Sequence, residues 1–254
     1  MKKQPTSWGN VSNWYNDLLK KENTYQNEVI LPNLLRLIKI KKTDIVLDLA
    51  CGQGFFSHEY AKFGEKIIGV DVSEELIKLA KKGSVANENF FVSPAANLFF
   101  LQSKIIDKIS IVLALQNIDN FDAVIKECSR VLKDNGKLFI VLNHPAFRIP
   151  KKSDWGYDAK NKVQYRRIEK YMSEININID MNPGEKVQKF KQYTKSFHIP
   201  LQSYFRAFNN NNFVVKNLEE WISNKKSQNG PRQKIEDIAR KEIPMFMCLE
   251  VIKI

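Results

Sequence analysis

The residues with the clearest chemical potential lie where two apolar segments each end near an aspartate. The segment 45–49 reads Ile-Val-Leu-Asp-Leu and opens into Ala-Cys-Gly-Gln-Gly, and a second apolar segment ends at Asp71. Glycines at positions 52 and 54 let the backbone approach a ligand without a Cβ in the way. A carboxylate at the end of the next strand can hold both hydroxyls of a ribose. The pattern predicts a nucleoside-containing cofactor at the carboxyl ends of parallel strands.

The glycine spacing argues against a dinucleotide and against a nucleotide triphosphate. A dinucleotide fold has a third glycine that allows close packing of helix on strand, and here that position is Ser57. No lysine follows the glycines as it does in a phosphate-binding loop. The ordered set of strand, Asp48-x-Ala50-Cys51-Gly52-x-Gly54, helix, strand and Asp71 resembles instead the cofactor motif of class I S-adenosylmethionine-dependent methyltransferases.

This resemblance implies S-adenosyl-L-methionine as cofactor and S-adenosyl-L-homocysteine as product. Asp48, Ala50, Gly52 and Gly54 would line the methionine end of the cofactor, and Asp71 would bind its ribose. The full set of positions that we assign to the cofactor is Tyr15, Asp48, Ala50, Gly52, Gly54, Asp71, Val72, Ala95, Ala96 and Leu115.

The chain departs from the family after its third predicted strand. The family commonly has an acidic residue there, which accepts a hydrogen bond from the adenine amino group. This chain reads Ser93-Pro94-Ala95-Ala96-Asn97, with Pro94 at the position of the acid. Adenine recognition is therefore expected to use backbone groups, Ser93 or Asn97.

Two histidines and two amides are candidates for the acceptor side of the site. Histidine is the side chain best suited to removing a proton near neutral pH, and His144 and His198 are the predicted catalytic residues. In small-molecule methyltransferases related to the quinone-biosynthesis enzymes, similar segments follow the fifth strand and the cap, although Ile199 stands here in place of an arginine. A turn or core role is the alternative for each histidine. Gln116 and Asn117 either border the acceptor or cap a turn.

Aromatic side chains complete the predicted acceptor site. Trp14 and Tyr15 resemble an N-terminal lid over the cofactor, or alternatively pack the first helix on the sheet. The residues that we assign to the acceptor are Trp14, Gln116, Asn117, Trp155 and Tyr204.

The elements that must position these residues alternate between strand and helix. Strands are predicted at 45–49, 66–70, 89–92, 109–115 and 137–142, and later at 213–218 and 245–254, with a turn at 134–136. Helices are predicted at 55–63, from Ser73 onward, and at 120–132, 200–210 and 234–242. This order predicts an α/β fold, a mostly parallel seven-stranded sheet with an antiparallel last strand and helices on both faces. We expect one domain, with a helical lid (1–40), a cofactor-binding core (41–142), a helical or irregular cap (143–199) and a closing part of the sheet (200–254).

Composition restricts the remaining possibilities. The chain has 254 residues, of which 43% are hydrophobic and 27% charged, as in globular proteins. It has no apolar run of the roughly 18–20 residues of a membrane span and no apolar secretion signal at its start, so we expect a cytoplasmic protein. Three scattered cysteines predict neither a disulfide framework nor a metal site.

The net charge of +12 raises the question of a nucleic-acid partner. Its lysine pairs are spread along the chain rather than gathered in one tract, so solvated surfaces explain most of them. We therefore expect a methyltransferase that acts on a small or medium organic acceptor. An RNA or protein methyltransferase and a non-catalytic cofactor-binding scaffold are the alternatives, and the oligomeric state stays open.

Overall fold

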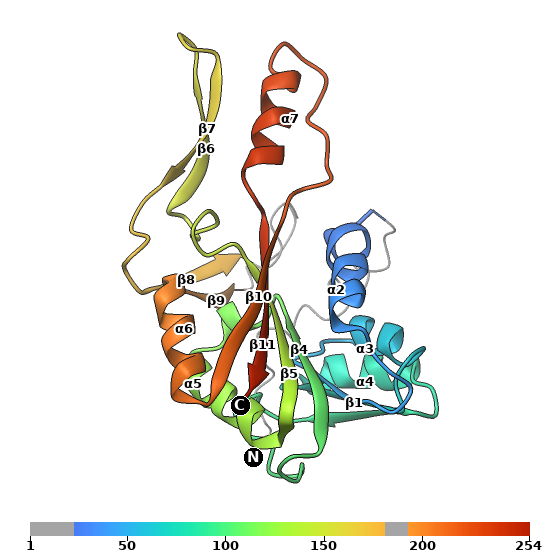
Figure 1. Ribbon diagram of the computed structural model, residues 1–254. Helices are drawn as coiled ribbons and strands as arrows, with labels where there is room; N and C mark the ends of the chain where they lie inside the picture. The colour runs from blue at the N-terminus through green and yellow to red at the C-terminus, as the bar shows by residue number, and fades with distance from the viewer. Residues whose placement is uncertain (1–22, 181–192) are drawn as a thin grey trace.

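A seven-stranded sheet forms the centre of the molecule in the computed structural model, which describes residues 23–180 and 193–254 (Figure 1). Its strand order is β10-β11-β5-β4-β1-β2-β3, and β11 is antiparallel to both of its neighbours. The strands are β1 (Ile45–Leu49), β2 (Lys66–Asp71), β3 (Glu88–Val92), β4 (Ile106–Val112), β5 (Leu132–Asn143), β10 (Phe213–Trp221) and β11 (Phe246–Lys253). The predicted α/β sheet with an antiparallel last strand is confirmed.

Helices cover both faces of this sheet, with α2 and α3 on one side and α5 and α6 on the other (Figure 1). The helices of the described residues are η2 (Gln26–Ile30), α2 (Leu31–Ile38), α3 (Phe55–Tyr60), α4 (Glu74–Lys82), η3 (Leu115–Asn117), α5 (Phe121–Val131), α6 (Leu201–Asn210) and α7 (Gln233–Glu242). Helix α4 begins directly after Ser73, as predicted, and the Ser73 hydroxyl caps it by accepting a hydrogen bond from the Leu76 N–H at 3.2 Å. No helix in the described part of the chain is long and apolar enough to cross a membrane.

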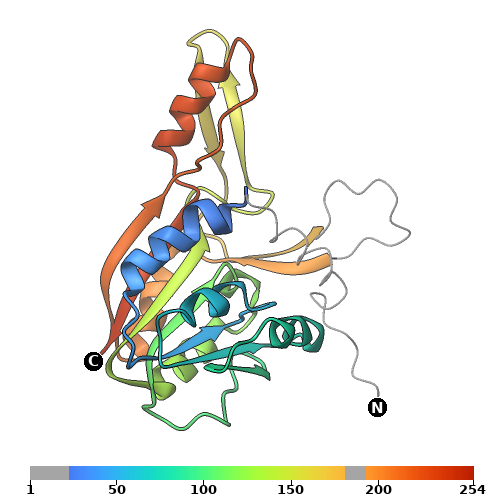
Figure 2. The ribbon, with the colours of Figure 1, turned by 90° about the vertical axis from the view of Figure 1, so that its right-hand side faces the viewer.

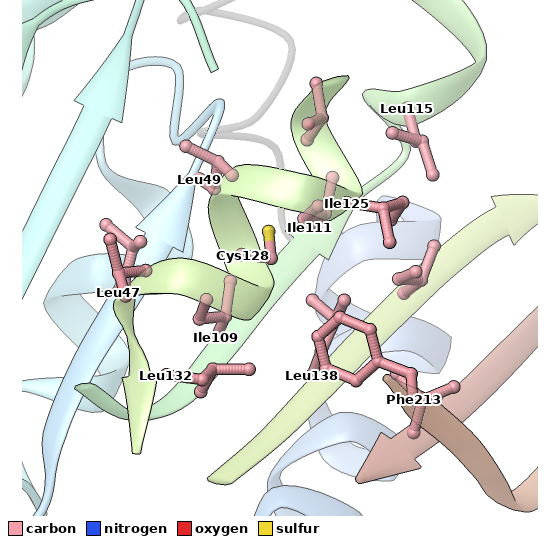
Figure 3. Packing of buried hydrophobic residues seen from close by; sticks show 14 of the residues in the cluster. Leu47, Leu49, Ile109, Ile111, Leu115, Ile125, Cys128, Leu132, Leu138 and Phe213 are labelled. Carbon is pink, nitrogen blue, oxygen red and sulfur yellow. The ribbon is translucent and has the colours of Figure 1, made fainter. Parts of the chain in front are cut away.

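The core has two layers because side chains of a strand point alternately to its two faces. Leu47 and Leu49 of β1 pack with Ile125 and Cys128 of α5 on one face (Figure 3). Val46 of β1 instead packs on the opposite face, against α2 and α3. This arrangement fixes the carboxyl end of β1 rigidly between two sets of helices.

The prediction of a helical or irregular cap at 143–199 is wrong, because the described residues of this segment form two antiparallel strand pairs. Strand β6 (Ser153–Asp158) pairs with β7 (Val163–Ile168), and β8 (Ile175–Asp180) pairs with β9 (Tyr193–His198). The β6–β7 hairpin extends beyond the central sheet beside α7 (Figure 2). A strand signal was present in 175–180, where isoleucines alternate with polar residues.

Two local predictions also need correction. The residues predicted as a turn at 134–136 lie within β5, where Asn135 adopts a left-handed backbone with φ of 63°. The fourth strand ends at Val112 rather than at residue 115, because Leu113 is also left-handed, with φ of 52°, and the chain then enters η3. The early end of β4 places residues 113–118 at the edge of the sheet.

Gly69 gives a test of the close contact between β2 and β3. A Cβ at this position would lie 2.3 Å from Cδ1 of the buried Phe90 ring. Because overpacking of a core typically costs about 1–3 kcal/mol, Gly69→Ala should lower the free energy of unfolding by that amount in urea titrations. Gly230→Ala is the matched control, since nothing lies within 4 Å of its added methyl group. Equal stability of the two variants would contradict this packing.

Candidate active site

A cavity of about 290 Å³ opens at the carboxyl ends of β1, β2, β3 and β4. Eight of the residues predicted from the sequence line it: Asp48, Ala50, Gly52, Asp71, Val72, Ala95, Ala96 and Asn117. Apolar side chains complete the wall, among them Phe55, Phe56, Leu76, Val112 and Ile118. We call this cavity the first cavity.

The loop after β1 is tightly wound where it meets the first cavity. Ala50, Gly52 and Gly54 have φ values of 60°, 58° and 86°, all in the left-handed region that favours glycine. A Cβ on Gly54 would lie 3.0 Å from the His58 ring and 3.1 Å from the Ala80 side chain. Gly54 therefore permits close packing behind the loop, and it is not among the residues that line the cavity.

Asp71 is held in a fixed orientation by backbone donors. One carboxylate oxygen accepts from the Gly52 N–H at 2.9 Å, and the other accepts from the Ser73 N–H at 2.8 Å. Burial raises the pKa of Asp71, while these two hydrogen bonds oppose the rise. A carboxylate has about four lone-pair sites, so each oxygen can accept one further hydrogen bond from a ligand in the cavity.

Asp48 is almost fully buried beside Asp71. Its two carboxylate oxygens accept hydrogen bonds from the hydroxyls of Ser57, at 2.7 Å, and Ser110, at 3.2 Å. Burial raises the pKa of Asp48 to about 6, and the hydrogen bonds from the two serines moderate the rise. Ser57 occupies the place of the missing third glycine, so its hydroxyl has a role that the glycine comparison did not reveal.

The opposite end of the first cavity follows β3. Its wall is formed by Ser93, Pro94, Ala95 and Ala96, with the half-exposed Val72 nearby. The Ser93 hydroxyl donates its proton to the Asn97 carbonyl at 2.6 Å, so the hydroxyl can only accept a hydrogen bond from a ligand. Flat, apolar walls of this kind suit an aromatic base.

A second cavity, of about 230 Å³, adjoins the first and shares Ile118 with it. Gln116, His198 and Tyr204 line it, together with the aromatic rings of Phe121 and Phe197. A small third cavity, of about 30 Å³, shares Gln116, Phe197, His198, Ile199 and Tyr204 with the second. The structure thus brings together three of the predicted acceptor-side residues next to the first cavity.

His198 and His144 differ in their surroundings. The His198 Nε2–H donates to the Tyr171 carbonyl at 2.8 Å, because a carbonyl can only accept, and this fixes a tautomer whose Nδ1 is unprotonated. The His144 Nδ1 accepts from the Ala146 N–H at 3.2 Å, so its Nε2–H donates to Glu220 at 2.7 Å. Burial lowers the pKa of both imidazoles. His198 therefore keeps a basic nitrogen beside the cavities, whereas both nitrogens of His144 are engaged.

Other predicted residues lie elsewhere. Leu115 is buried in the core that Figure 3 shows, and it lines the second cavity rather than the first. Trp155, on β6, lines none of the three cavities and faces the guanidinium groups of Arg148 and Arg166. Trp14 and Tyr15 lie outside the described residues. In the described part of the chain, no group of three or more histidine, cysteine, aspartate or glutamate residues could hold a metal ion.

Comparison with known proteins identifies the part of the chain that forms the first cavity. Residues 47–140 match the family model described as a methyltransferase domain. These residues form a methyltransferase domain of the class I fold. The match covers the loop after β1, both aspartates and the end of β4, which together make the first cavity. The resemblance inferred from the cofactor motif is therefore confirmed for this segment, and S-adenosylmethionine is the cofactor of this class.

The methyltransferase domain also has similar relatives and similar solved structures. A ubiquinone biosynthesis O-methyltransferase from Xanthomonas oryzae is 30% identical over 98 residues, which are 37% of this chain and 41% of that protein. The alignment thus spans about two fifths of that relative. An S-adenosylmethionine-dependent methyltransferase structure from Mesorhizobium loti has a TM-score of 0.68 at 19% identity, covering 91% of this chain and 99% of that one. Another, from Clostridium acetobutylicum, has a TM-score of 0.63 at 16% identity, covering 98% and 99%. These structures share the fold.

Proposed function

We propose that the protein transfers a methyl group from S-adenosylmethionine to a small or medium organic acceptor. The observation that carries the proposal is the pairing of two adjoining cavities. Asp48 and Asp71 line the first, and His198, whose Nδ1 is unprotonated, lines the second. Bound S-adenosylmethionine supplies a methyl group that its sulfonium already activates, so the protein has chiefly to align the acceptor with it. Such positioning can contribute roughly 7–11 kcal/mol.

The residues of the first cavity fit this cofactor. Asp71, oriented by two backbone N–H groups, would accept both ribose hydroxyls with its remaining lone pairs. Val72, Ala95 and Ala96 would contact the adenine through apolar surface. The carboxylate of Asp48 would face the positively charged methionine end, with Ala50 and Gly52 beside it.

The residues of the second cavity would bind the acceptor. Gln116 and Tyr204 line it, Asn117 lies at the neighbouring wall of the first cavity, and His198 would remove the acceptor proton through Nδ1. The name of the Xanthomonas relative, an O-methyltransferase, supports oxygen as the methylated atom. Screening small metabolites for transfer of a labelled methyl group would test the proposal, and transfer only to tRNA or rRNA, with steep salt dependence, would overturn it.

The Asp71 carboxylate provides a test of the cofactor site. Asp71→Ala should weaken S-adenosylmethionine binding at least tenfold, because two charge-assisted hydrogen bonds to the ribose are lost. Isothermal titration calorimetry would measure the change, with exposed Asp122→Ala on α5 as the control. Unchanged affinity of the Asp71 variant would show that this carboxylate does not hold the ribose. Failure of the unaltered, folded protein to bind the cofactor would overturn the proposed function.

A further inference from the structure

Arg148 carries a partly buried guanidinium group without an acidic partner. It lies in the segment that leads from β5 to β6, and no described carboxylate forms an ion pair with it. Its Nε is buried and has no hydrogen-bond partner in the described part of the chain. An unsatisfied buried donor is costly, and a charged one more so. An anion bound next to Arg148 would offset this cost.

The neighbours of Arg148 add positive charge. The Arg148 guanidinium lies 5.6 Å from the centre of the Trp155 ring, and the Arg166 guanidinium lies 5.3 Å from the same ring. Burial and then the charge of Arg166 lower the pKa of Arg148 to about 10. Arg166 itself is satisfied, since it donates to the Phe147 carbonyl at 2.9 Å and to the Ser153 hydroxyl at 2.9 Å. Arg148 is the member of this pair that is left to bind a ligand.

The unpaired guanidinium lines the cavity system of the proposed acceptor. Arg148 is part of the wall of the third cavity, whose small volume of about 30 Å³ suits a group of a few atoms. Gln116 lies on the same wall, and its buried Oε1 has no hydrogen-bond partner among the described residues. The third cavity adjoins the larger second cavity, where Phe121, Phe197 and Tyr204 form aromatic walls. The two adjoining cavities thus place a cation and an unpaired acceptor next to a compartment that has aromatic walls and also includes Asp119 and Glu174 in its lining.

We infer that the methyl acceptor is an organic acid whose carboxylate binds Arg148 and whose aromatic body occupies the second cavity between Phe121, Phe197 and Tyr204. The inference rests on the proposed function and specifies its substrate class. The planar guanidinium suits a carboxylate, and the unpaired Gln116 oxygen would accept a hydrogen bond from a hydroxyl group of the same molecule. The third cavity is too small for more than the acidic group itself, so the ring is left in the second cavity.

A pair of isosteric probes tests the inference without knowledge of the physiological acceptor. The probes are 4-hydroxybenzoate and its neutral analogue 4-hydroxybenzamide, titrated into the protein saturated with S-adenosylhomocysteine. We expect the benzoate to bind at least tenfold more tightly than the benzamide. Arg148→Gln should remove this preference, while S-adenosylhomocysteine affinity, measured separately, stays unchanged because Arg148 does not line the first cavity.

The control variant is Arg167→Gln, which removes the exposed guanidinium next to Arg166 on β7 and should keep the preference. Arg148→Lys, which retains the positive charge, should keep part of the preference for the benzoate. It replaces Arg148→Gln as the test if the glutamine variant fails to fold. Equal binding of the two probes, or binding of neither by protein that does bind S-adenosylhomocysteine, overturns the inference and leaves the proposed function standing. Loss of S-adenosylhomocysteine binding by the unaltered protein would instead reject the proposed function.

Discussion

Replacing Asp48 by asparagine should stabilise the protein more at pH 7.5 than at pH 4, by about 2 kcal/mol. Burial raises the pKa of Asp48 from 3.8 in the unfolded chain to about 6 in the folded one, and a rise of this size corresponds to about 3 kcal/mol. Well below pH 3.8 the carboxyl is protonated in both states, so the aspartate imposes no penalty, and a small part of the penalty is already present at pH 4. Between pH 3.8 and pH 6 the unfolded chain gives up this proton while the folded protein keeps it, so the stability of the unaltered protein falls relative to the variant. Above pH 6 the carboxyl is ionised in both states and the difference stays constant.

Denaturation in urea at a series of pH values would measure this difference. The free energy of unfolding of Asp48→Asn minus that of the unaltered protein should increase between pH 4 and pH 7 and then level off. Asp122→Asn is the matched control, because its exposed side chain gives no reason for such a rise. A difference for Asp48→Asn that does not change with pH would contradict the raised pKa.

The position of Asp48 explains why a destabilising carboxylate is present in the site. Asp48 is retained between two serine hydroxyls at the end of β1, where the cationic methionine end of the cofactor would lie. A positive ligand favours the ionised form of a nearby carboxyl group. The stability that the empty protein loses at neutral pH would therefore be recovered on binding, and an asparagine would forgo that gain.

The sequence predicted the cofactor half of the molecule well because its signals are local. The strand around Asp48, the glycines that follow and the strand that ends at Asp71 are contiguous, and helix α4 starts at a serine that caps it. Parallel strands read as short apolar runs, so their order and the helices between them could be derived. The use of Ser110 as a partner of Asp48 could not, because a hydrogen bond between residues 62 positions apart is set by strand pairing.

The acceptor half was predicted less well because its structure depends on contacts between distant segments. Polar, aromatic strands such as β6 and β7 lack an apolar face, so their pairing leaves little trace in composition. Only the alternation in β8 marked a strand. The unpaired charge of Arg148 is likewise invisible in sequence, where arginine is expected to be solvated or paired.

Replacing His198 by alanine should lower kcat about 100-fold without changing the affinity for S-adenosylmethionine. General-base catalysis typically contributes about 10²–10⁴-fold, and the Tyr171 carbonyl holds His198 in the tautomer with a free Nδ1. Because burial lowers the pKa of His198 from its ordinary value of 6.5, the imidazole is still largely neutral when the pH has fallen to 6.5. The kcat of the unaltered enzyme should therefore be flat from pH 6.5 to 8 and fall only at lower pH.

Steady-state kinetics with an acceptor found by the labelled-methyl screen would measure this effect, and added imidazole should restore part of the activity of His198→Ala. His144→Gln provides the comparison. Both ring nitrogens of His144 are already engaged, by Ala146 and Glu220, so its loss should affect stability more than kcat. If His144→Gln lost kcat as His198→Ala should, or if His198→Ala kept full activity, the proton would leave the acceptor by another route. The tautomer set by Tyr171 would then serve only to anchor β9 in the wall of the second cavity.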